Sequence, residues 1–169
     1  MKNLNKHDRI HFDPALSVPA GQDGLFLTPR VPCTVTDVGQ MVLGNHEAFI
    51  NSWCIRGDDG SEFWLLDDEK QEERVLLRLV AEAPHEGRQE PEWIHFNEYD
   101  IAHPAGGTVR YNLFSGGTIV ELGSDLLLIR IFTRKVEDDD EFLWVALRND
   151  DVVEYWIGVH VEPSQILRD

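Results

Sequence analysis

The residues in this sequence that could do chemistry most directly are carboxylates gathered in two short segments. The denser segment runs from Glu137 to Glu141, and the other contains Asp58, Asp59 and Glu62. Carboxylate oxygens suit Ca²⁺ or Mg²⁺, and they also attract the basic side chains of a protein partner. The spacing is not the alternating pattern of an EF-hand loop, and a hairpin turn needs polar residues in any case, so we expect no metal site. The candidate partner-binding residues are Asp58, Asp59, Glu62, Glu137, Asp138, Asp139, Asp140 and Glu141.

Histidines and hydroxyl nucleophiles form no recognisable catalytic motif. The seven histidines include no HExxH and no Cys/His pair at zinc-finger spacing, and no serine stands in a Gly-x-Ser-x-Gly frame. No GxGxxG or Walker pattern is present, so we assign no catalytic residue and no cofactor, and an enzyme is the less favoured reading. A site assembled from distant residues leaves no motif, however. Candidates for such a cleft are Trp93, His95, Tyr99 and His103.

Composition excludes several classes of partner. Fifteen Lys and Arg against 31 Asp and Glu give the 169-residue chain a formal net charge of −16, which repels nucleic acid and anionic membrane surfaces. No apolar run is long enough to span a bilayer, and the first residues lack the apolar stretch of a secretory signal. We therefore expect a cytoplasmic protein, in which Cys33 and Cys54 remain thiols.

The sequence predicts that the segments carrying the candidate residues are β-strands. Residues 48–56 are aromatic and β-branched, and residues 62–66 return after a turn rich in Gly and Asp, which predicts a hairpin. The residues at 44–47 are typical of a turn. Residues 75–80 fit either a strand or a helical turn, and no long helical period with matching caps is present, so helix content should be low.

The sequence also matches itself at an offset of 79 residues, without a gap, from Gly39–Pro84 to Thr118–Pro163. Leu43-Gly44 falls on Leu122-Gly123, and Glu62-Phe63 falls on Glu141-Phe142. We interpret this as an internal duplication and predict a mainly β protein. Its two similar antiparallel meander halves should pack as a sandwich or split barrel, because a single meander cannot bury its apolar face alone.

The expected organisation is one compact unit of two halves. Residues 1–33 form an N-terminal strand and loops, 34–84 a first β repeat, 85–117 a connector with short strands, and 118–169 a second β repeat.

A segment of the second repeat, from Leu122-Gly123 through Leu128–Thr133 to Asp139–Val145, resembles the YjfK-like family of uncharacterised bacterial proteins. The chain departs from the family pattern at Trp144 and in the first repeat at Asn51-Ser52-Trp53. The resemblance implies a bacterial, cytoplasmic, β-rich protein and brings no known activity or functional residues.

The charge favours a non-enzymatic accessory or regulatory protein, of inhibitor or immunity type, that binds a basic protein through its acidic face. The alternative is a β-sandwich that binds a small molecule or sugar, or a hydrolase, with a site between the halves. A third hypothesis is an oligomer formed through exposed strand edges.

Overall fold

The computed structural model describes residues 4–16, 24–43 and 48–169 and is mainly β. Helix is confined to short 3₁₀ turns such as η2 (Glu92–His95) and η3 (Pro163–Gln165). The strands are β1 (Arg9–Phe12), β2 (Cys33–Leu43), β3 (Ala48–Gly57), β4 (Glu62–Asp68), β5 (Glu73–Pro84), β6 (Glu98–Ala102), β7 (Thr108–Leu122), β8 (Asp125–Val136), β9 (Asp139–Arg148), β10 (Val152–His160) and β11 (Ile166–Arg168). The predicted turn at 44–47 lies outside the described residues. No helix in the described part of the chain is long and apolar enough to cross a membrane.

Two four-stranded meanders form the body of the molecule, which confirms the predicted fold class. Strands β2 to β5 make the first meander and β7 to β10 the second, and every pairing is antiparallel. Antiparallel pairing of β5 with β10 joins the meanders on one side. Residues 75–80, which the sequence left open between strand and helix, belong to β5.

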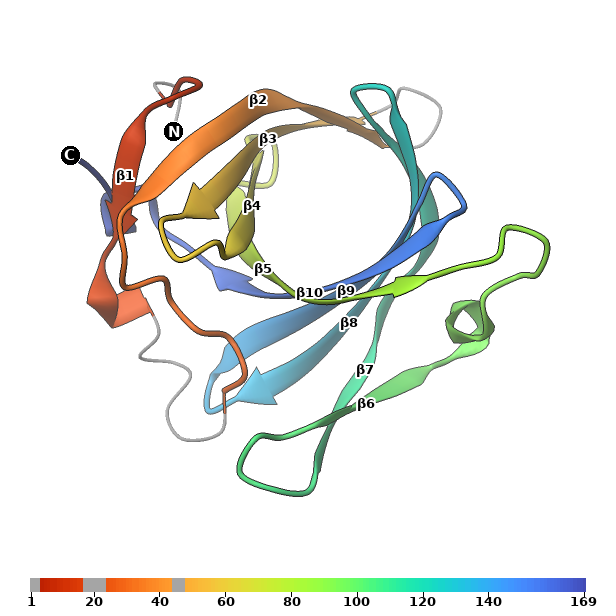
Figure 1. Cartoon of the computed structure of the whole chain (residues 1–169). Coiled ribbons are helices and arrows are strands. Elements are labelled where there is room, and N and C mark those ends of the chain that lie inside the picture. The colour runs from red at the N-terminus through yellow and green to blue at the C-terminus, as the bar shows by residue number, and fades with distance from the viewer. Residues whose placement is uncertain (1–3, 17–23, 44–47) are drawn as a thin grey trace.

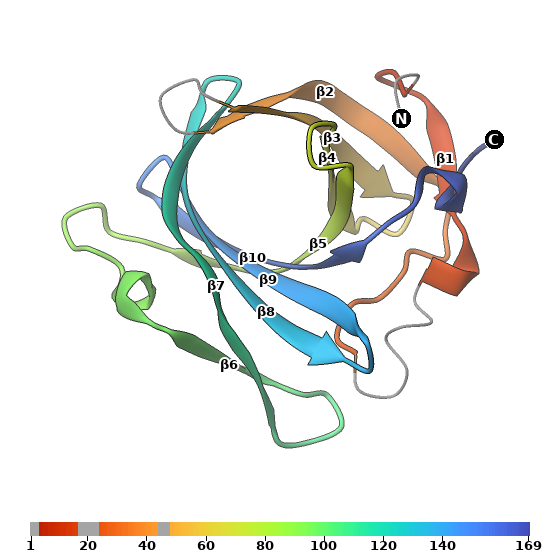
Figure 2. The same ribbon diagram turned by 180° about the vertical axis from the view of Figure 1, so that it is seen from behind.

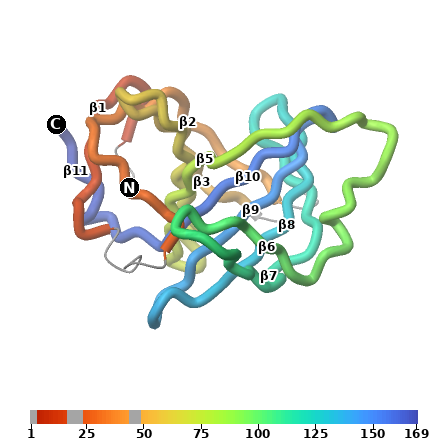
Figure 3. The backbone as a smooth tube through the Cα atoms, turned by 60° about the horizontal axis from the view of Figure 1, so that its bottom comes forward, coloured from red at the N-terminus to blue at the C-terminus, as the bar shows by residue number. Residues whose placement is uncertain are grey.

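The eight strands of the meanders close into a ring (Figures 1 and 2). Closure comes from the pairing of β2 with β7, in which Met41 lies opposite Leu122 and Leu43 opposite Val120. Closure removes the free edges that the two meanders would otherwise expose. Beyond the ring, β6 pairs with β7, while β1 pairs with both β2 and β11. Figure 3 shows β1 and β11 at one end of the molecule, away from β6.

The ring separates two apolar cores. Side chains alternate between the faces of a strand, so each ring strand sends one set of residues inward and the other outward. The interior core draws buried residues from seven ring strands, among them Met41, Trp64 and Val120, and Ile50 adds the eighth strand, β3. The outer core includes N-terminal residues such as Phe12 and Phe26, which cover the outside of the ring.

In the return strands β4 and β9, residues that the 79-residue offset aligns do not face the same side of the ring. Phe63 points outward and packs against Phe12, with 6.2 Å between ring centroids, whereas Phe142 belongs to the interior core. Trp64 and Trp144 both point inward, so the positions that face the same way differ by 144 − 64 = 80 residues. A shift of one residue reverses the face of every side chain in a strand. The common origin of the halves stays a prediction.

The second meander begins earlier than the sequence predicts. β7 starts at Thr108, inside the predicted connector, and runs through Gly116 and Gly117. Its register against β8 shifts between Leu113 and Ser115 and again between Ser115 and Thr118. Glycines within a strand commonly mark such bulges, and bulges bend the strand. The long bent β7 is therefore able to pair with β6, β8 and β2.

Candidate functional site

The acidic residues of the β3–β4 turn form local bonds. Asp58 makes two hydrogen bonds with the Arg9 guanidinium, at 2.7 and 2.8 Å, which lower the pKa of this carboxyl. Asp59 accepts hydrogen bonds from the hydroxyl and backbone N–H of Ser61. Glu62 lies 3.2 Å from Arg56. Basic neighbours therefore neutralise part of the charge of this turn.

The acidic residues of the β8–β9 turn have two different environments. Glu137, Asp138 and Asp139 are exposed, as an acidic binding face requires. Glu141, by contrast, is only 1% exposed. It therefore does not belong to an exposed acidic face, and the prediction that Glu141 binds a partner through such a face is wrong. Asp140 lies between these extremes and forms an ion pair with Lys135 at 2.8 Å.

Glu141 joins the N-terminal segment to the outside of the ring. Its carboxylate accepts hydrogen bonds from the backbone N–H groups of Leu25 and Phe26, at 2.9 and 3.1 Å. The Tyr111 hydroxyl donates to it at 2.5 Å and the Arg134 guanidinium at 3.0 Å. A buried carboxylate is tolerated when its charge is paired and its oxygens are hydrogen-bonded. Burial and the Glu141 charge together raise the pKa of Tyr111.

The four residues suggested for a cleft lie outside the ring, on η2, β6 and the turn that follows. Trp93 is buried in the outer core, and exposed His95 contacts Glu90 at 3.1 Å. Tyr99 packs against Phe132 and Tyr155 and borders two hollows of the outer surface. His103 accepts a hydrogen bond from the Ala105 backbone.

A cavity of about 390 Å³ lies inside the ring, between the two meanders. All eight ring strands contribute to its lining, so its shape depends on closure of the ring. Most of the wall is apolar, and polar side chains are few. The lining residues are Leu43, Ile50, Leu66, Asp68, Glu73, Val75, Phe114, Ser115, Thr118, Val120, Ile129, Ile131, Asp140, Phe142, Trp144 and His160.

The polar part of the lining comes from strand ends. Asp68 ends β4 and Glu73 begins β5, and the two residues lie directly opposite each other in the register. Asp68 accepts hydrogen bonds from the backbone N–H groups of Lys70 and Gln71, at 3.1 and 3.3 Å. His160 ends β10, and its ring packs edge to face on Phe142. Among the described residues, the charged side chains of the lining are thus carboxylates, with one histidine and no Lys or Arg.

An ion-pair network occupies the ring interior near the opposite ends of the strands. Arg148 lies two residues beyond Ala146 of the interior core, and therefore on the same face of β9. Its guanidinium contacts Asp125 at 2.6 Å and Glu154 at 3.1 Å. Hydrogen bonds from Asn149 and Arg148 lower the pKa of Asp125. These bonded side chains close one end of the interior, while the cavity occupies the other.

Three tryptophans lie between the ion-pair network and the cavity, and one of them, Trp144, forms part of the cavity wall. The Trp64 ring lies 6.2 Å from Trp144 and 5.3 Å from Trp156, between centroids. Trp144 borders the cavity, whereas Trp64 and Trp156 do not. The indole N–H groups of Trp64 and Trp156 have no hydrogen-bond partner within the described residues. An aromatic layer of this kind provides a rigid apolar floor for the cavity.

Comparisons with protein-family models, with curated proteins and with solved structures gave no match to this chain. The resemblance to the YjfK-like family thus stays a prediction. Of the residues suggested from the sequence, Asp140 lines the cavity; ten of the sixteen lining residues are ordinary apolar side chains without a motif, which no sequence pattern singles out. A strand such as Leu127–Ile131 carries apolar residues on both faces, so its inward-facing residues cannot be identified until the ring is known.

Proposed function

We propose that this protein binds a small molecule with an apolar body inside the strand ring. The observation that carries the proposal is the cavity of about 390 Å³, which has mostly apolar walls and lies at one end of the ring interior. Small-molecule sites commonly have volumes of about 300–1,000 Å³, with apolar walls and a few placed polar groups. This develops the alternative of a site between the halves, with different residues from those first suggested.

The energetics of the cavity favour an apolar ligand. Each Å² of apolar surface removed from water contributes about 25 cal/mol, and the walls are built of side chains such as Ile129, Ile131 and Val75. The strands that carry them are hydrogen-bonded to neighbours on both sides, so binding requires little ordering of the backbone. Preorganisation of this kind raises affinity because less conformational entropy is lost on binding.

The test is a titration with N-phenyl-1-naphthylamine, a neutral apolar dye whose fluorescence rises in apolar surroundings. We compare the native chain with Val75→Phe and Val80→Phe. Both valines lie on β5, but Val75 lines the cavity, whereas Val80 is outside it and 46% exposed. Val75→Phe fills part of the cavity and should abolish saturable binding, whereas Val80→Phe should bind as the native chain does. Equal binding by all three chains would contradict the proposal.

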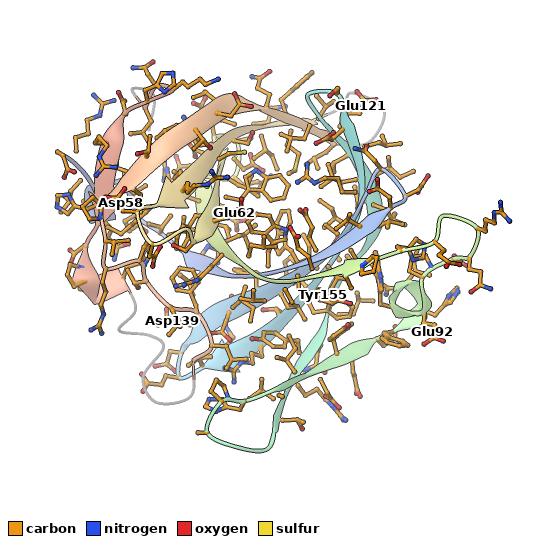
Figure 4. All side chains as sticks on the ribbon, viewed as in Figure 1. Asp58, Glu62, Glu92, Glu121, Asp139 and Tyr155 are labelled. Atoms are coloured by element: carbon orange, nitrogen blue, oxygen red, sulfur yellow. The ribbon has the colours of Figure 1, made fainter. Side chains whose placement is uncertain are left out.

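A second candidate function is binding of a basic protein through the acidic surface. It rests on the net charge of −16 and on the exposed residues Glu137, Asp138 and Asp139. The labelled acidic residues lie at separate places around the ring (Figure 4), as Glu92 and Glu121 illustrate. Surface attraction of this kind weakens with salt. Loss of a captured basic protein on raising the salt and on Glu137→Gln/Asp138→Asn would support this function, and unchanged capture would oppose it.

A further inference from the structure

We propose that the molecule bound in the ring carries a protonated amine, which lies between the carboxylates of Asp68 and Glu73 while its apolar part occupies the cavity. The inference rests on the proposed function and specifies its ligand as a cationic amphiphile. Three features of the structure carry it: two neighbouring carboxylates without a basic partner, a lining that has no Lys or Arg among the described residues, and the apolar wall beside the carboxylates.

Asp68 and Glu73 are two neighbouring carboxylates whose negative charges are not neutralised by a basic side chain of the described residues. They lie opposite each other on neighbouring strands, and like charges in that position are destabilising. Neither carboxylate forms an ion pair with any Lys, Arg or His of the described residues. The backbone N–H groups of Lys70 and Gln71 both donate to one Asp68 oxygen, Oδ1, which leaves the other oxygen to accept from a ligand. A cation between the two carboxylates would remove their repulsion.

The remaining polar lining groups are compatible with a cation and unsuited to an anion. Asp140 is already paired with Lys135, whose side chain is 67% exposed and does not line the cavity. The hydroxyls of Ser115 and Thr118 can accept hydrogen bonds from an ammonium group. A carboxylate or phosphate ligand would meet three carboxylates and no Lys or Arg. The net charge of −16 adds a long-range field that attracts cations.

The position of the carboxylates also fixes the orientation of the ligand. Asp68 lies two residues beyond Leu66 on β4, and Glu73 lies two residues before Val75 on β5. Residues two apart in a strand face the same side, so each carboxylate lies on the same face as an apolar wall residue. In both strands the carboxylate is the one nearer the strand end. The amine is therefore expected at the strand ends, and the apolar part along Leu66 and Val75 toward Trp144.

The experiment measures displacement of N-phenyl-1-naphthylamine by octylamine, 1-octanol and octanoate at pH 7 and low salt. The three probes share one apolar chain and differ in the charge of the head group. We expect octylamine to bind about tenfold more tightly than 1-octanol, with octanoate the weakest, because one charge-assisted contact is worth about 1.4 kcal/mol. Asp68→Asn/Glu73→Gln should bring the octylamine affinity to that of 1-octanol, both measured on this variant.

A matched control variant removes two negative charges at positions outside the cavity. Glu86→Gln/Glu92→Gln replaces exposed carboxylates outside the cavity and should keep the preference for octylamine. If 1-octanol displaces the dye as well as octylamine does, the amine inference is overturned while the proposed function stands. If both double variants lose the preference equally, the preference comes from net charge and the assignment to Asp68 and Glu73 is wrong. If the dye itself does not bind, the proposed function fails first.

Discussion

Trp64 and Trp144 pack edge to face inside the strand ring, 6.2 Å apart, although they belong to the return strands of different meanders. Trp144 borders the cavity, and Trp64 lies behind it against Trp156. The contact links the halves of the protein through their interior. It also places an intrinsic fluorophore in the wall of the proposed binding site.

Tryptophan fluorescence should therefore report binding. Octylamine is expected to change the emission of the native chain, because it alters the surroundings of Trp144. Trp144→Phe should lose most of that change, whereas Trp93→Phe, which alters a tryptophan of the outer core, should retain it. The measurement is an emission titration with dye displacement run in parallel as an independent affinity. A full response in Trp144→Phe would place the ligand elsewhere.

Among the acidic residues from Glu137 to Glu141, Glu141 on β9 should be the one on which stability depends most. Glu141→Ala leaves the Arg134 guanidinium, whose side chain is 12% exposed, without its carboxylate, and we expect a loss of about 3–5 kcal/mol in the free energy of unfolding. Asp139→Asn, at an exposed position of the same strand, should leave the urea midpoint unchanged. Urea unfolding followed by circular dichroism measures both. Equal effects of the two changes would contradict the structural role of Glu141.

Asp125 should contribute stability that disappears in acid. Hydrogen bonds from Asn149 and Arg148 lower its pKa in the folded state, so the contribution is complete above the ordinary value of 3.8 and is lost as the pH falls through the lowered pKa. Because the side chain is 35% exposed, solvent screening limits the effect, and we expect Asp125→Asn to cost about 1 kcal/mol at pH 7. The cost should decrease as the pH falls from 7 to below 3.8. Urea midpoints of both chains across this pH range test the sign, and a cost that grows in acid would refute it.

Gly158 should resist substitution because β5 lies close to it. A Cβ at this position would lie 2.6 Å from the Leu76 carbonyl oxygen and closer still to the Leu77 side chain. Gly158→Ala is expected to lower the free energy of unfolding by about 1–3 kcal/mol through overpacking. Gly116→Ala is the control, since a Cβ there meets no atom within 4 Å. Thermal unfolding of the two variants should separate them, and similar melting temperatures would argue against tight packing of β5 on β10.

The sequence was sufficient for the strands and hairpins but not for the ring. Aromatic and β-branched composition, together with turn residues, predicted strands such as 48–56 and 62–66, because these signals are local. Closure depends on a few residue pairs between β2 and β7, and on bulges near Gly116 that bend β7. Such long-range pairing leaves no periodic signal.

The candidate site was harder to predict for the same reason. Trp93 and Tyr99, which the sequence suggested for a cleft between the halves, pack on the outside of the ring. The cavity residues become neighbours only when eight strands come together, and Asp68 and Glu73 look like ordinary turn carboxylates until their register is known. Charge, in contrast, is a property of the whole chain and was available from composition.

The most direct test of the central claim is an isotope-filtered NOE experiment on the ¹³C-methyl-labelled protein with unlabelled octylamine. The account predicts NOEs from the alkyl chain to the methyl groups of Val75, Ile129 and Ile131, which line the cavity. NOEs to Ile119 and Leu126 instead, whose side chains are 58% and 50% exposed, would show surface adsorption and contradict an interior site.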